Sequence, residues 1–292
     1  MSYNEFKTID EQLEALRSKG LIIDNDAEAR QFLFCVGYYT FKGYSRTLSN
    51  HGDFYPGTRF KNIMDIYMFD HELRHVLLKY IEKIEVRFKS IYAYRFAQMH
   101  NPDTYLDIGK FTDDETHSSI VSKADYYKNQ RIKHDENLKA IEDSGQVIPI
   151  WAYLEFVSFG EASLLYSITD AQVKDVIAAD YGLTVSSKAD IIRKFIHRMV
   201  DLRNLCAHWD RLHNFIFSQK PFLNKHELGL LIRKPDGSYD NEHLYAFVIV
   251  MRRLLMPDEF SEMKSKIIDL NKKYPFVHMR HYGFRDDWRE KL

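Results

Sequence analysis

The sequence predicts an all-α fold, a compact multi-helix bundle with little or no sheet. Two observations lead to this class. Only 12 glycines and 7 prolines interrupt the 292 residues. Most long segments also carry apolar residues three and four positions apart, which is the period of a helix with one buried face. With 45% hydrophobic residues, the chain is long enough to bury a large core.

Two short helices are expected near the N-terminus. The first covers 8–19, because Thr8 and Glu11 have the spacing of a capping box. The second covers 27–37. The next stretch, "GYYTFKGYSRTLSNHGDFYPGTRF", contains four glycines and a proline, so it predicts a loop or a small hairpin rich in aromatic residues.

The centre of the chain predicts a long helix over 61–99 and a connector over 101–114. Residues 115–143 are helical in pattern but strongly polar, and we expect "YYKNQRIKHDENLKAIEDSG", residues 126–145, to be exposed to solvent. "PIWAYLEFVSFGEASLLYSI" restores a buried helical pattern, which Gly160 interrupts.

The C-terminal part predicts three more helices, the first of them with Ser187 as its cap and Asp190 three residues later. Their expected ranges are 186–214, 241–256 and 258–273, the last two separated by Pro257. We expect 1–60 to pack as N-terminal helices and an aromatic loop on a helical core of 61–292, within one continuous domain.

The composition predicts a soluble, cytoplasmic protein. The formal net charge is -1, so RNA or an acidic membrane could be attracted only by a local patch. Cys35 and Cys206 lack CxxC spacing and fit free buried thiols in a reducing cytosol. The N-terminus resembles no export signal, and no run of about 18 apolar residues predicts a membrane span. We expect no membrane and no DNA partner.

The stretch "RNLCAHWDRLHN", residues 203–214, places polar side chains on an expected helix. At about 100° per residue, one stripe forms a core face and the other side is polar. The stripe holds Ile191, Phe195, Met199, Leu202, Cys206 and Trp209, and the polar side holds His197, Asp201, Asn204 and His208.

Arg203 lies roughly 140° around the helix from His208, so one straight helix does not pair them. A second copy of the helix, or a local break after Arg203, would build a composite cleft. An arginine that binds phosphate and a histidine that moves a proton suit phosphodiester cleavage. The alternative is the polar face of an ordinary amphipathic helix.

"LRNLCAHWDRLHN" closely resembles the signature of the Abi-like proteins, in the AbiD and AbiF branch of bacterial abortive-infection systems. Its helix carries the RxxxxH motif of the HEPN ribonuclease superfamily. The resemblance extends in order along nearly the whole chain. It includes "TIDEQLEALRSKGLII", "GYYTFKGY", "IYMFDHELRHVLLKYIEKIEVRFKS", "IPIWAYLEFVSFGEASLLY" and "GFRDDWRE".

This resemblance implies an endoribonuclease without metal or cofactor, acting as a toxin-like effector of phage defence. Its catalytic residues would be Arg203, Asn204 and His208. The attacking group would be the ribose 2′-hydroxyl, which leaves a 2′,3′-cyclic phosphate. HEPN enzymes typically form the site across a homodimer, and a small RNA is a possible antitoxin or guide. The alternative from another class is a non-catalytic RNA-binding module bound to a small structured RNA.

The chain departs from the family pattern at two positions. Members often have a second histidine directly after the motif histidine and a tryptophan before the final asparagine. Here Trp209 and His213 occupy those positions. Since Trp209 falls on the apolar stripe, we expect it to pack in the core.

"HELRH", from His71 to His75, matches the HExxH pattern of zinc proteases. No third ligand occurs at a zincin spacing, and both histidines project away from the core face of their helix. A zinc protease is therefore a remote alternative, and we expect no metal.

Charged residues also lie on or beside the apolar stripe of the 61–99 helix, where a buried charge requires a partner. They belong either to an internal ion-pair network or to a group that supports the site or contacts RNA. The candidates for this second role are Asp70, Arg74 and Arg87, together with Arg211, His213 and Asn214 next to the motif. A second RxxxxH, from Arg95 to His100, lacks the asparagine and is interpreted as chance.

Overall fold

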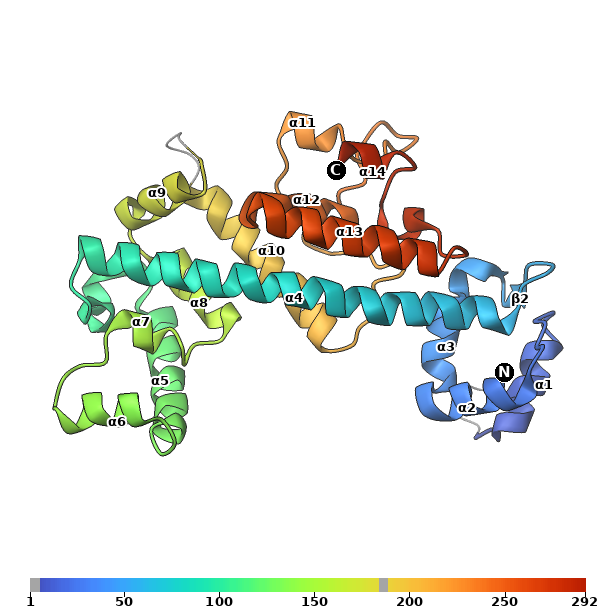
Figure 1. Cartoon of the computed structure of the whole chain (residues 1–292), viewed down its shortest axis with the longest axis horizontal. Helices are drawn as coiled ribbons and strands as arrows, with labels where there is room; N and C mark the ends of the chain where they lie inside the picture. Colours follow the sequence, from blue (N-terminus) through green and yellow to red (C-terminus); the bar gives the residue numbers. More distant parts are fainter. Residues whose placement is uncertain (1–5, 184–188) are drawn as a thin grey trace.

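In the computed structural model, which describes residues 6–183 and 189–292, helices surround one long helix (Figure 1). The α-helices are α1 (Ile9–Arg17), α2 (Asp26–Val36), α3 (Tyr38–Ser45), α4 (Phe60–Met99), α5 (Asp114–Arg131), α6 (Glu136–Asp143), α7 (Ile150–Tyr153), α8 (Phe159–Ile168), α9 (Ala171–Asp180), α10 (Ala189–Ala207), α11 (Lys225–Leu228), α12 (Leu244–Leu254), α13 (Pro257–Lys273) and α14 (Trp288–Lys291). The strands β1 (Ser49–Asn50) and β2 (Asp53–Phe54) pair antiparallel.

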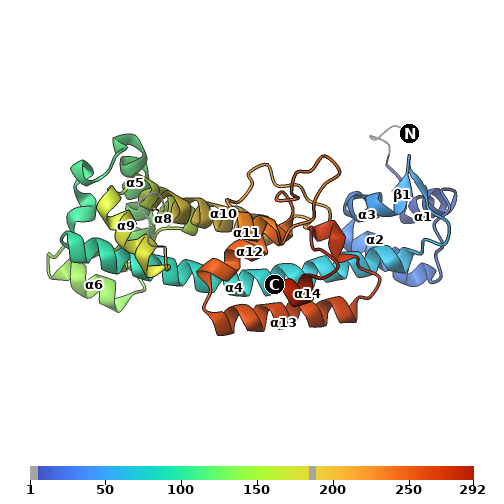
Figure 2. The ribbon, with the colours of Figure 1, turned by 90° about the horizontal axis from the view of Figure 1, so that it is seen from above.

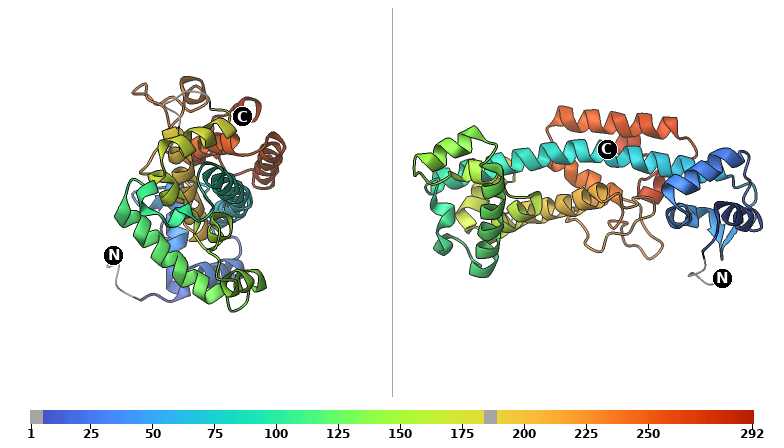
Figure 3. Two further views of the ribbon diagram at one scale, coloured as in Figure 1. Left: turned by 90° about the vertical axis from the view of Figure 1, so that its left-hand side faces the viewer. Right: turned by 90° about the horizontal axis from the view of Figure 1, so that it is seen from below.

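The 40 residues of α4 form the axis of the molecule and extend for about 60 Å. α13 lies along one side of α4, and α10 crosses another side (Figure 2). The α1–α3 group lies at one end of α4 and the α5–α7 group at the other (Figure 3). α4 therefore contacts segments from both halves of the sequence, among them α3 and α13.

The all-α class is confirmed, with 66% of the chain helical and only the small β1–β2 sheet within the described residues. None of the described helices has both the length and the apolar composition required to cross a bilayer.

The N-terminal prediction is confirmed for two helices and the hairpin, but it missed α3. The Thr8 side chain accepts from the Glu11 N–H, as the capping-box spacing predicts. α3 lies inside the segment predicted as a loop. Gly37 separates it from α2 at φ 87°, and a second glycine, Gly43, lies within it. Both glycines disfavour a helix by propensity, so tertiary packing determines this one.

The central prediction is correct for α4 and less so for the segments beyond it. The 115–143 stretch breaks into α5 and α6. The first part of α5 buries His117, Ile120 and Ala124, whereas residues 126–145 are mostly exposed, as predicted. The interruption assigned to Gly160 occurs earlier, between α7 and α8, where Ser158 caps α8. α9 was not predicted.

The C-terminal helices α12 and α13 match their predicted ranges within a few residues, and Pro257 is the first residue of α13. The helix predicted over 186–214 is wrong beyond Ala207, where α10 ends. The predicted cap at Ser187 lies outside the described residues.

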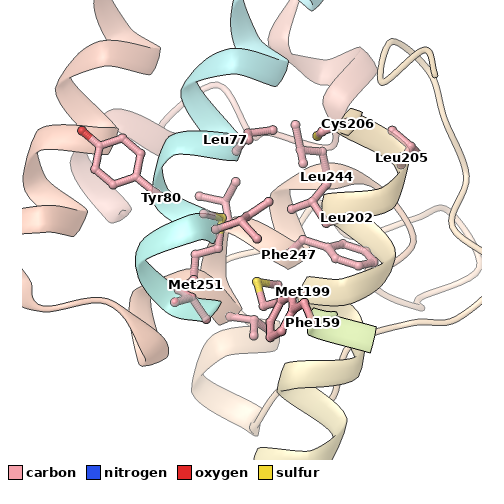
Figure 4. Close-up of a cluster of buried hydrophobic side chains, with 14 of the residues drawn as sticks. Leu77, Tyr80, Phe159, Met199, Leu202, Leu205, Cys206, Leu244, Phe247 and Met251 are labelled. Carbon is pink, nitrogen blue, oxygen red and sulfur yellow. The ribbon is translucent and has the colours of Figure 1, made fainter. Parts of the chain in front are cut away.

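α10 is held in place by a hydrophobic cluster between α4, α8 and α12 (Figure 4). Met199, Leu202 and Cys206 of α10 are buried there, as the helical periodicity predicts. Burial also raises the pKa of the Cys206 thiol to about 12, so this cysteine is an inert packing residue. Cys35, which was expected to be buried too, is exposed on α2. The cluster fixes the direction in which the end of α10 points.

Candidate functional site

The candidate site begins where α10 ends. The Trp209 N–H donates to the Cys206 carbonyl (3.3 Å) and the Asp210 N–H to the Leu205 carbonyl (3.1 Å), which is the Schellman arrangement. The left-handed residue of this turn is Trp209, with φ 63°, where glycine is usual. Such a backbone costs a bulky L-residue roughly 1–2 kcal/mol.

This turn overturns the expected placement of Trp209. The helical projection put the side chain on the core face, but 61% of it is exposed. A helical projection applies only to residues with helical backbone angles, and Trp209 lies two residues past the end of α10.

Asp70 ties the segment after the turn to the core. One carboxylate oxygen accepts from the Leu212 N–H (2.9 Å) and the Tyr44 hydroxyl (2.7 Å). The other accepts from the Tyr282 hydroxyl (3.0 Å). Burial raises the pKa of the Asp70 carboxyl, while these donors and Arg74 oppose that shift. One acidic side chain thus joins α3, α4, the motif segment and the C-terminal region.

Arg74 completes the network from the next turn of α4. Its guanidinium donates to Asp70 (2.6 Å), to the Tyr44 hydroxyl and to the Asp210 carbonyl (both 3.2 Å). Arg74 is 2% exposed and Asp70 is fully buried. Of the two interpretations open for this pair, the contacts match an internal ion pair that also holds the backbone beside the motif.

The three candidates after the motif histidine are also held by the fold. Arg211 donates to the Gly43 carbonyl and lies over the Tyr44 ring. His213 is buried, with its Nε2 3.0 Å from the Thr47 hydroxyl, and burial lowers its pKa to about 3. Asn214 is exposed, and its N–H donates to the His281 carbonyl (2.8 Å).

The three catalytic candidates lie at the solvent-exposed end of α10. Arg203 donates to the Asn204 side chain (3.1 Å) and, in the part of the chain that the structure describes, has no carboxylate partner. His208 is exposed, and within 6–183 and 189–292 its side chain makes no hydrogen bond or ion pair. α10 is unbroken from Arg203 to Ala207, and the His208 N–H still bonds the Asn204 carbonyl (2.9 Å).

A pocket of about 240 Å³ lies against this end of α10. Asp201, Asn204 and Phe215 are among its lining residues, so the pocket joins the polar side of the helix to the segment after the turn. Burial raises the pKa of the Asp201 carboxyl, although Arg198 opposes the shift from 3.1 Å.

The HELRH residues do not converge on a common centre. The Glu72 carboxylate faces α13, where it accepts from Lys273 (2.7 Å) and the Tyr274 hydroxyl (2.6 Å). The His71 and His75 rings instead contact Trp209. Among the described residues, the one grouping with metal-ligand geometry is Asp240, Glu242 and His243, on another segment. The zinc-protease alternative therefore gains no support.

The model of the family of Abi-like proteins matches residues 31–214. The match runs from α2 to the end of the motif segment and covers more than half of the chain. The chain belongs to the family of Abi-like proteins. Membership suggests a part in abortive infection, a defence against phage. Searches of curated proteins and of solved structures found no match.

Two arginines of this Abi-like protein lie away from the motif. Arg87 binds Glu259 (2.8 Å) and the Leu254 carbonyl (3.1 Å), which fastens α4 to the start of α13. It lies 13 residues beyond Arg74, about 20 Å along α4. The second RxxxxH is split between two ion pairs, Arg95 with Asp180 and His100 with Asp170 (Nε2 to Oδ2, 2.9 Å).

The sequence missed several residues that shape the site of this Abi-like protein. Tyr44 and Tyr282 are separated by more than two hundred residues, and both donate to Asp70. No local pattern could indicate that contact. Asp201 did appear on the polar side of the helix, but its place in the pocket depends on Phe215 and Phe217 from beyond the turn.

Proposed function

We propose that this Abi-like protein is a metal-independent endoribonuclease of the HEPN type, a toxin-like effector of abortive infection. Arg203, Asn204 and His208 would be its catalytic residues. The observation that carries the proposal is the state of His208, which is exposed and has no side-chain partner in the described chain. It lies at the end of α10, and the segment that follows is anchored to buried Asp70 through the Leu212 N–H. A free imidazole on a fixed support is suited to proton transfer.

The reaction needs only the substrate's own hydroxyl as nucleophile. His208 would take the proton from the ribose 2′-hydroxyl, whose oxygen attacks phosphorus, or protonate the departing 5′-oxygen. The P–O5′ bond breaks as the P–O2′ bond forms, giving a 2′,3′-cyclic phosphate and a 5′-hydroxyl. Arg203 would stabilise the charge on the non-bridging oxygens, and Asn204 would orient one of them.

A homodimer is part of this proposal. α10 has no break between Arg203 and His208, and roughly 140° of helix surface separates the two side chains. A phosphate in contact with both is therefore more easily held by Arg203 of one protomer and His208 of the other. Pairing of the motif helices about a two-fold axis would create two such sites.

The test uses total bacterial RNA in EDTA, with wild-type protein and the variants His208→Ala, Arg203→Ala and His134→Ala. His134 is an exposed histidine between α5 and α6, so it is a matched control. We expect wild type and His134→Ala to leave cyclic-phosphate ends. Loss of His208 or Arg203 should lower the rate by about a hundred-fold or more.

Three results would contradict the proposal: cleavage that EDTA abolishes, equal cleavage by His208→Ala, or no cleavage by any protein. RNA that co-purifies uncut with both wild type and His208→Ala would favour the RNA-binding module instead. Light scattering on the same samples tests the dimer.

A further inference from the structure

The indole of Trp209 is one residue from His208 and is held in a defined orientation. The His71 ring stacks on it, with ring centroids 5.6 Å apart and an angle of 15° between planes. The His75 ring meets it edge-on at 5.6 Å, and the Tyr67 ring stacks in turn on His71. His75 is itself oriented through Nδ1, 2.9 Å from the His71 carbonyl.

This support leaves the ring accessible. Although His71 covers one face, 61% of Trp209 remains exposed. The ring also stands on a left-handed residue, φ 63°, at a position where glycine would be free of strain. The fold gains little burial from this tryptophan and accepts backbone strain to hold it, a combination that is found at ligand-binding positions.

We propose that Trp209, supported by His71, is a stacking platform for a nucleobase adjacent to the scissile phosphate. The inference rests on the proposed function, because His208 fixes where that phosphate lies. Consecutive Cα atoms are about 3.8 Å apart, so the backbone positions that carry the platform and the catalytic imidazole stay adjacent. Arg203, without a carboxylate partner in the described residues, adds a positive charge for the backbone.

The platform assigns the substrate class. A flat aromatic face binds any base, but only a base that has left its own helical stack can lie on it. The substrate is therefore single-stranded RNA, or the loops and bulges of a structured RNA, cut beside an unpaired nucleotide. Double-stranded RNA offers no free base face, so it should bind without contact to Trp209.

The variant for the test is Trp209→Gly. Glycine adopts the left-handed backbone without strain, so the turn should persist and the melting temperature should stay equal or rise. The probe is a short fluorescent single-stranded RNA, compared with the duplex of the same sequence, measured by anisotropy. A His208→Ala background prevents cleavage. Trp209→Phe retains an aromatic face, and Trp151→Ala removes an exposed tryptophan from α7 as a control.

We expect Trp209→Gly to weaken the binding of single-stranded RNA about ten-fold and to leave duplex binding unchanged. Trp209→Phe should keep most of the affinity for single-stranded RNA that Trp209→Gly loses. His71→Ala should give a smaller loss of the same kind, because the ring is then free to turn.

Equal affinity of Trp209→Gly for single-stranded RNA would overturn the platform, as would an equal loss for single strand and duplex. If light scattering shows that wild type is a dimer and that Trp209→Gly is a monomer, Trp209 contacts a second copy of the chain instead. If RNA binding depends on Trp209 but wild type never cleaves, the platform stands and the ribonuclease proposal fails. If no RNA binds, both fail.

Discussion

Asp70 shows how much of the site depends on one side chain. It accepts hydrogen bonds from two tyrosines and a backbone N–H, and it is ion-paired with buried Arg74. The charge pattern of α4 indicated Asp70 and Arg74 as residues that require partners. It could not identify the partners, because Tyr44, Leu212 and Tyr282 come from three distant segments.

Replacing Asp70 with alanine should destabilise the protein by roughly 3–5 kcal/mol, because Arg74 would remain charged and buried without its partner. RNA cleavage should fall as well, since the Leu212 N–H loses its anchor. Urea unfolding and the cleavage rate measure the two effects.

Tyr282→Phe is the milder comparison, because it removes one hydroxyl from Asp70 and keeps the ring. We expect it to cost about 1 kcal/mol. If Asp70→Ala were no more costly than Tyr282→Phe, the network would not be the anchor described above.

At the scale of the helices, the sequence predicted interiors better than ends. The core face of α10 was identified from its periodicity, but its end was not, because Trp209 occupies the position where a glycine would have marked it. α3 was missed because glycines are present where the chain nevertheless forms a helix. Gly37 before it and Gly43 inside it indicate a loop, yet Gly43 leaves room for the Arg211 guanidinium that lies against it.

Gly43→Ala tests that explanation. An added Cβ would lie 3.1 Å from a guanidinium nitrogen of Arg211 and would push it from the Gly43 carbonyl. Helix propensity favours alanine by about 1 kcal/mol, so the net change in stability should be small. RNA cleavage should nevertheless fall several-fold, because Arg211 belongs to the segment directly after His208.

Thermal unfolding and RNA cleavage of Gly43→Ala separate the two effects. Gly160→Ala is a control for glycine replacement inside a helix, because nothing would lie closer to the added Cβ than Val200 Cγ1, at an ordinary 3.7 Å. Unchanged cleavage by Gly43→Ala would mean that Arg211 does not help to position the motif segment.

At the scale of the whole molecule, the all-α class and the long α4, α12 and α13 could be predicted because their apolar periodicity is regular and uninterrupted. The breaks in 115–143 and at α7–α8 could not, since they depend on which side chains the neighbouring helices cover. The candidate site was predicted as a set of residues along one helix. Its supports, Tyr44, Tyr282 and the pocket-lining Phe215 and Phe217, required the folded chain.

Acid sensitivity is a property of the whole fold that His213 helps to set. Burial lowers its pKa to about 3, while in the unfolded chain it is about 6.5. Above pH 6.5 the imidazole of His213 is neutral in both the folded and the unfolded state, so its contribution to stability is constant. Below it, only the unfolded state binds the proton, so stability falls by roughly 2 kcal/mol by pH 5.

Urea unfolding at pH 7.5, 6 and 5 measures this slope. His213→Gln keeps a side chain able to bond Thr47 but cannot titrate, so its stability should fall less steeply with acid. Burial also lowers the pKa of His71, His197 and His281, and these contribute in the same direction. Identical slopes for the variant and wild type would show that His213 is not buried in its neutral form.

The hydrogen bond from the Tyr282 hydroxyl to Asp70 affects when the site is completed during synthesis of the chain. Domains fold as the chain leaves the ribosome, N-terminal parts first, at about 5–20 residues per second. The motif helix emerges well before Tyr282, yet the buried carboxylate that anchors the segment after this helix lacks one of its donors until Tyr282 arrives. Under the proposed function, a nascent chain beside the ribosome's own RNA would carry an incomplete nuclease. Full activity would then begin only once the chain had been made beyond Tyr282 and that residue had left the ribosome.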